Sequence, residues 1–380
     1  MKGGLITTQR ASGLSARITG LIRALPGISR VQLSQSLALS PATVSRSVQE
    51  LVDLGCLRES PGNIAASGRP RVGLYVDPSC AYALVLDIKV ESAVAGFVDF
   101  SGQLLDREVL DEPMGDVARA MDSLPRLMGR MLNKHVAEAD HLLGVGVAIT
   151  GTWNTLHRAL VFSPSLPQWH GVNLEQPFRS LPGEYLVVDN DSRAAASAEM
   201  MIGSGRRFQD FVYLYGDYGI GSAIVHRRTI VRGQENLGSG MGHMLISLDP
   251  TWPICDGCGR RGCLGAVVNA AIIAERIGRG SPRAEVLSAV ADYLAVAVAN
   301  LLNQLCPEAI VLGGRLFHTY TELYPMVVKA CRERLLEHIL HRVAFVRAEL
   351  DPDAALVGMA TQVFSRDTDV STVGWGRISS

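Results

Sequence analysis

The chain has 380 residues, of which 47% are hydrophobic and 19% charged, and its formal net charge is -1 at pH 7. These values exclude a disordered chain and a uniformly basic one, and the length predicts two or three domains. No apolar run reaches the ~18 residues of a membrane span and the first residues lack a signal peptide's apolar segment, so we expect a cytoplasmic protein with reduced thiols and no membrane partner.

The charge is unevenly distributed along the chain. Residues 1–78 hold nine Lys/Arg and four Asp/Glu, a net charge of +5, whereas residues 79–380 hold 27 and 33, a net charge of -6. A basic first segment joined to an acidic body indicates that only the first segment meets nucleic acid. Ordinary scatter of charge is the alternative, so the interpretation depends on the local pattern.

Three short helices are predicted in the first segment. Apolar residues at helical spacing mark the first, over residues 15–25. Ser29 is the expected N-cap of the second, over residues 30–37. Ser40 followed by Pro41 starts the third, which runs to about Asp53 and stops at Gly55.

The third helix has two different faces. Val44, Val48 and Leu51 lie on one, and small, polar and basic side chains lie on the other, as a major groove requires. The pattern predicts a helix-turn-helix; a three-helix interaction module without DNA contact is the alternative. The residues predicted to contact DNA on this helix are Ser40, Pro41, Ala42, Thr43, Ser45, Arg46 and Gln49.

A two-stranded wing is predicted after this helix, and Arg69 and Arg71 at its tip are expected to contact phosphate or enter a minor groove. We therefore expect a winged helix-turn-helix DNA-binding domain over residues 1–78.

The pattern changes near Pro78, and residues 79–380 are expected to form an α/β domain of two lobes around a cleft. Apolar strands are predicted within residues 81–105 and over residues 142–151, 185–191, 211–225 and 308–314. Helices are predicted over residues 116–137, 192–202, 267–277, 284–305 and 322–338.

A cysteine cluster follows in this second part. His243, Cys255, Cys258 and Cys263 form the pattern H-x11-C-x2-C-x4-C, and three thiolates with one imidazole suit a closed structural Zn2+ site over residues 243–263. A thioredoxin-like redox motif is the alternative, but no βαβ context surrounds it and a third cysteine follows. Unpaired, buried packing positions are expected for the remaining cysteines, Cys56, Cys80, Cys306 and Cys331.

Several motifs, in this order, resemble the DNA-binding branch of the ROK family (repressors, open reading frames, kinases). They include "GRPRVGLYVDP", "VDNDSRAAASAE", "GIGSAI", "MGHM", "CGRRGC", "NLLNQLCPEAIVLGG" and "DAALVGMA". The resemblance covers essentially the whole chain. It implies a winged helix-turn-helix followed by a two-lobed actin-like, sugar-kinase (ribonuclease H-like) fold, assembled as a homodimer or homotetramer. It also implies a repressor whose affinity for a palindromic operator responds to a sugar or sugar derivative.

The resemblance also places the parts of a kinase site. Asp87 is kept, but Lys89, Val90 and Glu91 stand where the family's first phosphate loop has Gly-Gly-Thr. In the second phosphate turn, Tyr218 replaces a threonine. Backbone amides approach phosphate through glycines, so these replacements argue against nucleotide binding.

On the sugar side, Asn190 and Asp191 match the family's sugar-binding asparagine and catalytic base, whereas Gly240 and Gly265 replace two glutamates. The alternative is that Asn190 and Asp191 only cap a helix. The predicted effector-binding residues are Asn190, Asp191, Arg193 at the pocket rim and His243. We expect a regulator without kinase activity; an active sugar kinase with an appended DNA-binding domain and a body that only dimerises the heads remain alternatives.

Overall fold

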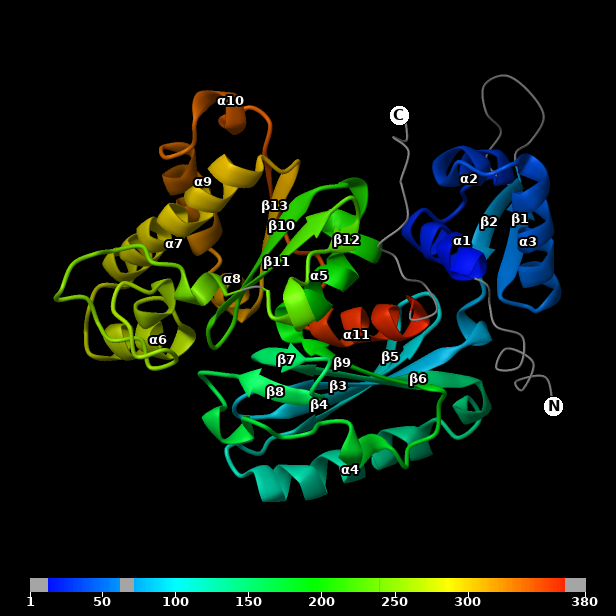
Figure 1. Ribbon diagram of the computed structural model, residues 1–380, viewed down its shortest axis with the longest axis horizontal. Helices are drawn as coiled ribbons and strands as arrows, with labels where there is room; N and C mark the ends of the chain where they lie inside the picture. Colours follow the sequence, from blue (N-terminus) through cyan, green and yellow to red (C-terminus); the bar gives the residue numbers. More distant parts are fainter. Residues whose placement is uncertain (1–12, 62–71, 239, 366–380) are drawn as a thin grey trace.

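The computed structural model describes residues 13–61, 72–238 and 240–365, which form an N-terminal head and a body of two lobes (Figure 1). The predicted winged helix-turn-helix and the α/β body are confirmed. The elements of the head are α1 (Gly13–Ala24), α2 (Arg30–Leu37), α3 (Pro41–Asp53), β1 (Leu57–Pro61) and β2 (Val72–Val76).

Local sequence fixes where the helices of the head begin. The Ser29 hydroxyl accepts the Gln32 amide, and the Gln32 side chain accepts the Ser29 amide in return, which caps α2. Ser40 caps α3 by accepting the Thr43 amide at 3.1 Å, with Pro41 in the first helical position. The predicted starts of both helices are therefore confirmed.

The wing is a hairpin in which β1 and β2 pair antiparallel, with Leu57 opposite Val76 at its base. Its tip, with the predicted DNA contacts Arg69 and Arg71, lies outside the described residues.

The first lobe is a five-stranded sheet in the order β5-β4-β3-β6-β9. On β3, Ala83 and Val85 face one core, whereas Leu84 and Leu86 face another, so each strand face packs separately. The elements of this lobe are β3 (Tyr82–Ile88), β4 (Ala93–Asp99), β5 (Leu104–Leu110), α4 (Val117–Lys134), β6 (Leu142–Ile149), β7 (Thr152–Asn154), β8 (Ala159–Phe162) and β9 (Tyr185–Asn190).

The second lobe is a five-stranded sheet in the order β12-β11-β10-β13-β14. Its strands are β10 (Phe211–Gly216), β11 (Ile220–His226), β12 (Thr229–Ile230), β13 (Ala309–Gly313) and β14 (Ala344–Arg347). Its covering helices are α6 (Ala270–Gly278), α7 (Arg283–Leu305), α8 (Arg315–Thr319), α9 (Leu323–Arg332) and α10 (Glu337–Leu340).

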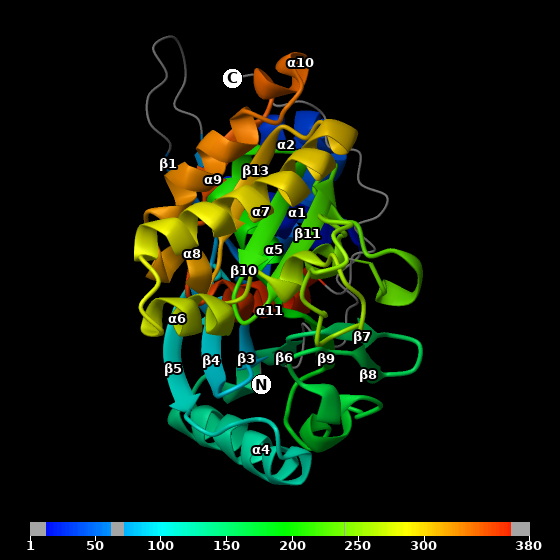
Figure 2. The same ribbon diagram turned by 90° about the vertical axis from the view of Figure 1, so that its left-hand side faces the viewer.

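Two helices, α5 (Asp191–Met201) and α11 (Ala354–Ser365), lie between the two sheets (Figures 1 and 2). They approach very closely, because a Cβ atom at Gly358 of α11 would overlap the Ala194 carbonyl of α5. Small residues where α5 and α11 cross allow this close approach, so this one pair of helices serves both lobes.

The body differs from the sequence prediction in several places. The helix predicted over residues 322–338 is two helices, α9 and α10, because the Asn303 side chain of α7 bonds the Arg334 carbonyl and the Leu336 amide between them. The strands β7, β8, β12 and β14, most of β5, and the helices α8 and α11 were not predicted.

One helix among the described residues, α7, is long and apolar enough to cross a membrane by length and composition. Of its most apolar window, 56% is buried inside the protein, in the core of the second lobe. A core helix accounts for this hydropathy.

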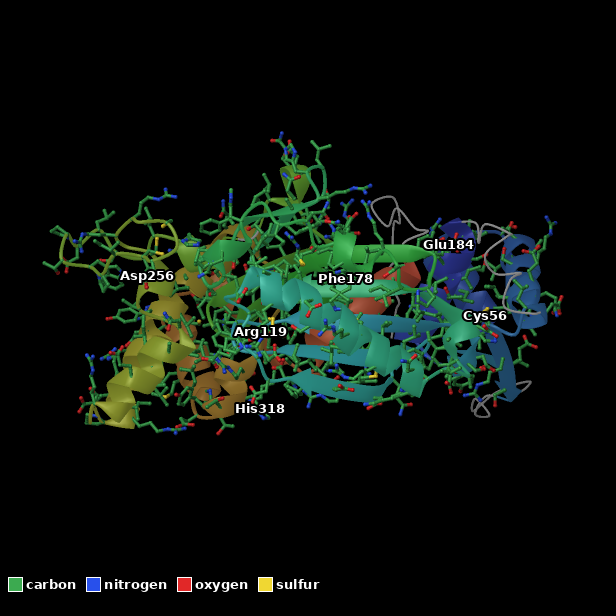
Figure 3. The ribbon with its side chains drawn as sticks, turned by 90° about the horizontal axis from the view of Figure 1, so that it is seen from below. Cys56, Arg119, Phe178, Glu184, Asp256 and His318 are labelled. Atoms are coloured by element: carbon green, nitrogen blue, oxygen red, sulfur yellow. A yellow bond between two sulfur atoms is a disulfide. The ribbon has the colours of Figure 1, made fainter. Side chains whose placement is uncertain are left out.

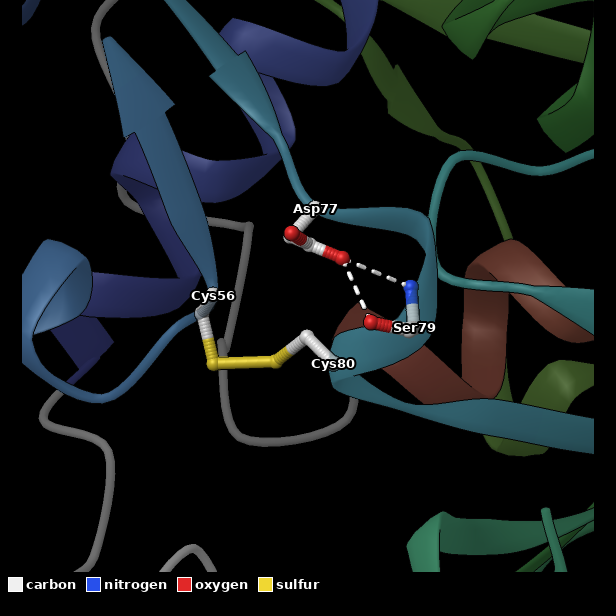
Figure 4. Close-up of a disulfide and its surroundings, with 4 residues drawn as sticks. All are labelled: Cys56, Asp77, Ser79 and Cys80. Carbon is white, nitrogen blue, oxygen red and sulfur yellow. Dashed lines mark hydrogen bonds between the residues drawn. A yellow bond between two sulfur atoms is a disulfide. The ribbon is translucent and has the colours of Figure 1, made fainter. Parts of the chain in front are cut away.

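A disulfide joins Cys56 and Cys80, which corrects the prediction that both are unpaired packing residues (Figure 4). Pairing of β1 with β2 brings the Asp77 amide to the Cys56 carbonyl, and the turn at Pro78–Cys80, capped by Asp77, then returns Cys80 to Cys56. Their Cα atoms lie 4.9 Å apart. The bond therefore closes the base of the wing against the first turn of the body. Cys306 also differs from its prediction, since it is exposed, whereas Cys331 is buried as expected.

Maleimide labelling of denatured, metal-free protein without reductant tests this bond. We expect five labels on the wild type, one for each free cysteine, and six on Cys80→Ser, in which Cys56 is released. Loss of the cross-link is expected to lower the free energy of unfolding by about 3 kcal/mol, since the closed loop spans 24 residues. Seven labels on the wild type would contradict the assignment.

Candidate functional site

The structure places the predicted DNA-contacting residues together on the outer side of α3. Val44, Val48 and Leu51 are buried against the head, and the opposite side of the helix is open to solvent. Arg46 is exposed and makes no hydrogen bond or ion pair with other described residues. Of the remaining residues on this side, Thr43 and Ser45 are half-buried and Ser40, Pro41, Ala42 and Gln49 are exposed.

Arg30, which the sequence analysis missed, organises this surface. Its guanidinium donates to the Ser45 carbonyl at 2.9 Å, pairs with Glu59 on β1 at 2.9 Å and reaches Gln49 at 3.4 Å. Gln49 in turn donates to Asp53 at 2.9 Å. Gln49 is therefore held by neighbours, whereas Arg46 is unengaged among the residues described.

Arg23 belongs to the basic surplus of the first segment but faces the body. Its Nε donates to the Phe100 carbonyl at 2.8 Å, and its guanidinium lies 4.6 Å from the Phe100 ring centroid and 5.1 Å from that of Phe364. Burial lowers the pKa of Arg23 to about 10. The residue anchors α1 to the body instead of contacting nucleic acid.

The body contains a cavity of about 380 Å³ between its lobes. Turns from both lobes line it, and its apolar lining includes Phe162, Ile254 and Ile272. Its polar lining includes Lys89, Thr150, Asn190, Asp191, Asp217 and His243. The cavity therefore gathers the residues predicted for the effector site.

Asn190 caps α5, and the hydrogen bonds of its side chain serve that role. Its Oδ1 accepts the amides of Ser192 and Arg193, and its Nδ2 donates to the Gly151 carbonyl at 2.8 Å and to Asp191 Oδ1 at 2.9 Å. The capping role anticipated as an alternative is thus present. Asp191 Oδ1 also accepts the Ser192 amide, and no described group bonds its Oδ2.

Burial and, after it, the nearby carboxylates of Asp87 and Asp217 together raise the pKa of Asp191 to about 7. The folded protein then binds this proton more tightly than the unfolded chain, so between about pH 4 and pH 7 stability falls as pH rises.

Asp191→Asn removes this penalty and keeps an oxygen acceptor for Ser192. We expect the variant to exceed the wild type in stability by about 1–3 kcal/mol at pH 8, with the gain vanishing near pH 4. Thermal unfolding at both pH values measures this, and Asp122→Asn, in an exposed ion pair on α4, is the control. An equal gain at both pH values would contradict the assignment.

Arg193 does not present its charge at the pocket rim as predicted. Its side chain is 1% exposed and its guanidinium bonds Asp189 at 2.9 Å and the carbonyls of Asn236 and Gly238. Burial alone would raise the pKa of Asp189, but Arg232 and Arg193 outweigh it and hold the pKa at about 2. Arg193 thus fixes the loop that borders the cavity.

A lysine lies in the part of the cavity where the family resemblance places nucleotide phosphates. Lys89 Nζ lies 3.2 Å from Asp87 Oδ2 and 3.4 Å from Asp217 Oδ2. From the sequence, Lys89 was interpreted only as a replaced glycine, and Asp217 was not predicted as a site residue. Lys89 and Asp217 lie in two turns far apart in the chain, so the sequence gave no signal that they pair.

The two glycines in place of glutamates also line the cavity. Apart from its chain neighbours, no described residue has an atom within 4 Å of where a Cβ of Gly240 would be, whereas at Gly265 the Gly242 carbonyl would be 3.0 Å away. The loss of a side chain at Gly240 therefore leaves open space and no carboxylate acceptor there.

His243, Cys255, Cys258 and Cys263 are brought together at the edge of the cavity, as the spacing predicted. Their donor atoms all lie within 4.8 Å of one another, with Cys255 Sγ 3.6 Å from His243 Nδ1 and Cys258 Sγ 3.5 Å from Cys263 Sγ. These separations fit donors around one tetrahedral ion with bonds of about 2.0–2.3 Å. Burial lowers the pKa of His243, which favours the neutral, metal-binding imidazole.

Glycines let the chain turn tightly around these four residues, called the metal cluster below because their donor atoms could hold one ion. Gly259 and Gly262 have φ of +70° and +91°, and a Cβ at Gly257 would clash with Pro164. Figure 3 shows Asp256, beside the cluster, at the opposite end of the molecule from Cys56. The metal cluster therefore supports the cavity and not the head.

Two family models match the chain. The ROK family model matches residues 83–365, and the model for winged helix-turn-helix DNA-binding domains matches residues 17–58. The chain is 22% identical over 371 residues to the xylose repressor of Bacillus subtilis, covering 91% of this chain and 93% of that protein. It is 24% identical over 303 residues to the glucokinase of Thermotoga maritima, covering 71% of this chain and 93% of the glucokinase.

Among solved structures, the chain resembles a ROK family transcriptional regulator described as a homologue of the Escherichia coli MLC protein. The TM-score is 0.76 at 22% identity, covering 95% of this chain and 98% of that one. The similarity confirms the predicted fold, a winged helix-turn-helix followed by the two-lobed sugar-kinase-like fold.

Proposed function

The chain belongs to the ROK family, and we propose that it is a sequence-specific DNA-binding repressor that responds to a sugar or sugar derivative and lacks kinase activity. One observation carries the DNA-binding part: α3 turns a polar, basic face with an unengaged Arg46 to solvent, beside a wing. The xylose repressor, similar over 91% of this chain, supports the same function.

Helix α5 supplies a physical connection from the cavity to the head. Its first residue, Asp191, lines the cavity, and its last, Met201, lies against Gly20 of α1, with the Met201 methyl 3.7 Å from where a Cβ would be. A ligand that shifts the start of α5 would thus move the packing of α1. In a dimer this would alter the spacing of the two α3 helices relative to the two halves of a palindromic operator.

We also propose that the metal is Zn2+, that the protein acts as a homodimer or homotetramer in the cytoplasm, and that the DNA-binding domain ends near residue 78. The donor set supports zinc, since three thiolates and an imidazole are its usual structural ligands. A palindromic operator would require an even number of subunits.

A second candidate function, an ATP-dependent sugar kinase, is favoured by Asp191, a carboxylate in the cavity that could accept a hydroxyl proton near pH 7. Lys89, Val90 and Glu91 in place of a glycine loop argue against it. An ADP-release assay across hexoses and amino sugars separates the two. Turnover abolished by Asp191→Asn would establish the kinase.

The proposed repressor is tested by band-shift titration of promoter fragments, including the one upstream of its own gene, at moderate salt. We expect a shift that an excess of unrelated DNA does not remove. A thermal-shift screen with sugars tests the effector, because a ligand that binds only the folded protein raises its stability. Equal binding to every fragment would overturn the proposal.

A further inference from the structure

Two turns face each other across the nucleotide side of the cavity. One follows β3 in the first lobe and carries Lys89 and Glu91; the other joins β10 to β11 in the second lobe and carries Asp217 and Tyr218. The Lys89 ammonium bridges Asp87 on its own strand and Asp217 on the other lobe, at 3.2 and 3.4 Å. Lys89 and Asp217 are far apart in the sequence and belong to different lobes, so their contact fixes one lobe against the other.

A second contact joins the same turns. The Tyr218 hydroxyl donates to Glu91 Oε2 at 2.9 Å, again from one lobe to the other. Arg315 of α8 supports the second-lobe turn, with its guanidinium 4.1 Å from the Tyr218 ring centroid and its Nε 3.1 Å from Asp217 Oδ1. Asp217 is therefore held by two cations, one from each lobe.

Because these contacts are buried, they hold the two lobes together more strongly than surface ion pairs would. The side chains of Lys89, Asp87 and Asp217 are 21%, 3% and 8% exposed. Removing the ammonium would leave the buried carboxylate of Asp87 without its cation and that of Asp217 with Arg315 alone, which is unfavourable. A nucleotide phosphate entering here would meet the carboxylates of Glu91 and Asp217, with Lys89 already paired.

We propose that Lys89, Asp217, Glu91 and Tyr218 form an interlobe latch, in which the tethered ammonium of Lys89 joins the carboxylates of the two lobes and holds the cleft ready for an effector without any nucleotide. The latch rests on the proposed function only in treating the cavity as the effector site. The latch positions the two lobes relative to each other, and it involves no chemical reaction.

Hydrogen–deuterium exchange of the full chain tests the latch. The exchange rate of the backbone amides in each turn is measured after a substitution in the turn of the other lobe. Lys89→Met combined with Glu91→Gln is expected to speed exchange of residues 215–221 about ten-fold, because interlobe bonds to charged groups are lost. Tyr218→Phe, which removes one hydroxyl, is expected to speed exchange of residues 86–92. The control Lys134→Met breaks an exposed ion pair with Glu108 inside the first lobe and should change neither turn.

MgADP is the second probe, and it should protect neither turn in the wild type. Unchanged exchange in the opposite lobe for both latch variants would overturn the proposal, and so would protection of both wild-type turns by MgADP. Neither measurement uses DNA or an effector, so failure of the latch and failure of the repressor function are distinguishable.

Discussion

Replacing Cys258 with serine is expected to remove the bound metal and to lower the thermal midpoint of unfolding by about 10 °C. Metal binding stabilises small zinc modules by about 10–16 kcal/mol, and part of that free energy is folding free energy of the surrounding chain. Residues 243–263 contain two isolated bridges but no extended strand and no α-helix, so a bound ion would carry most of their order. The effect should reach the cavity, because His243 and Cys255 line it.

Metal analysis of the purified protein and thermal unfolding measure this prediction together. We expect one zinc per chain in the wild type and close to none in Cys258→Ser. Cys306→Ser is the matched control, because Cys306 is an exposed cysteine outside the metal cluster. Equal zinc content in both variants would contradict a metal site at these four residues.

Arg46→Ala is expected to weaken binding to the operator about 10- to 100-fold while leaving thermal stability unchanged. An arginine that reads a base edge contributes about 1–3 kcal/mol of discrimination. The fold should tolerate the change, since Arg46 is exposed and no other described residue bonds it. Binding to unrelated DNA should fall much less, because the phosphate contacts of the rest of the head remain.

Fluorescence anisotropy with a short labelled operator duplex gives both affinities. Arg126→Ala on α4, an exposed arginine far from the head, controls for the loss of one positive charge. A similar loss in the two variants would mean that Arg46 acts only through overall charge, and no loss in either would remove α3 from the DNA interface.

The head could be predicted from sequence almost to the residue, because its signals are local. A serine hydroxyl, a proline and the spacing of Val44 and Val48 determine where α3 begins and which side it buries. Metal ligands close in the chain are equally visible, since Cys255, Cys258 and Cys263 lie within nine residues.

Contacts between distant segments escaped prediction for the opposite reason. The disulfide depends on the register of β1 against β2, which places Cys56 beside Cys80. The position of Lys89 depends on two lobes meeting, and the burial of Arg193 depends on a loop some 40 residues later. The family resemblance marked Lys89 as a replaced glycine and Arg193 as a charge at the pocket rim, but only the fold shows that each is paired with a carboxylate.

The ratio of two dissociation constants tests the central claim most directly. The full-length protein is titrated against a duplex carrying its recovered binding site and against a scrambled duplex of the same length and composition, at one fixed moderate salt concentration. We predict binding to the site at least about a thousand-fold tighter. Equal affinity for the two duplexes would contradict a sequence-specific repressor.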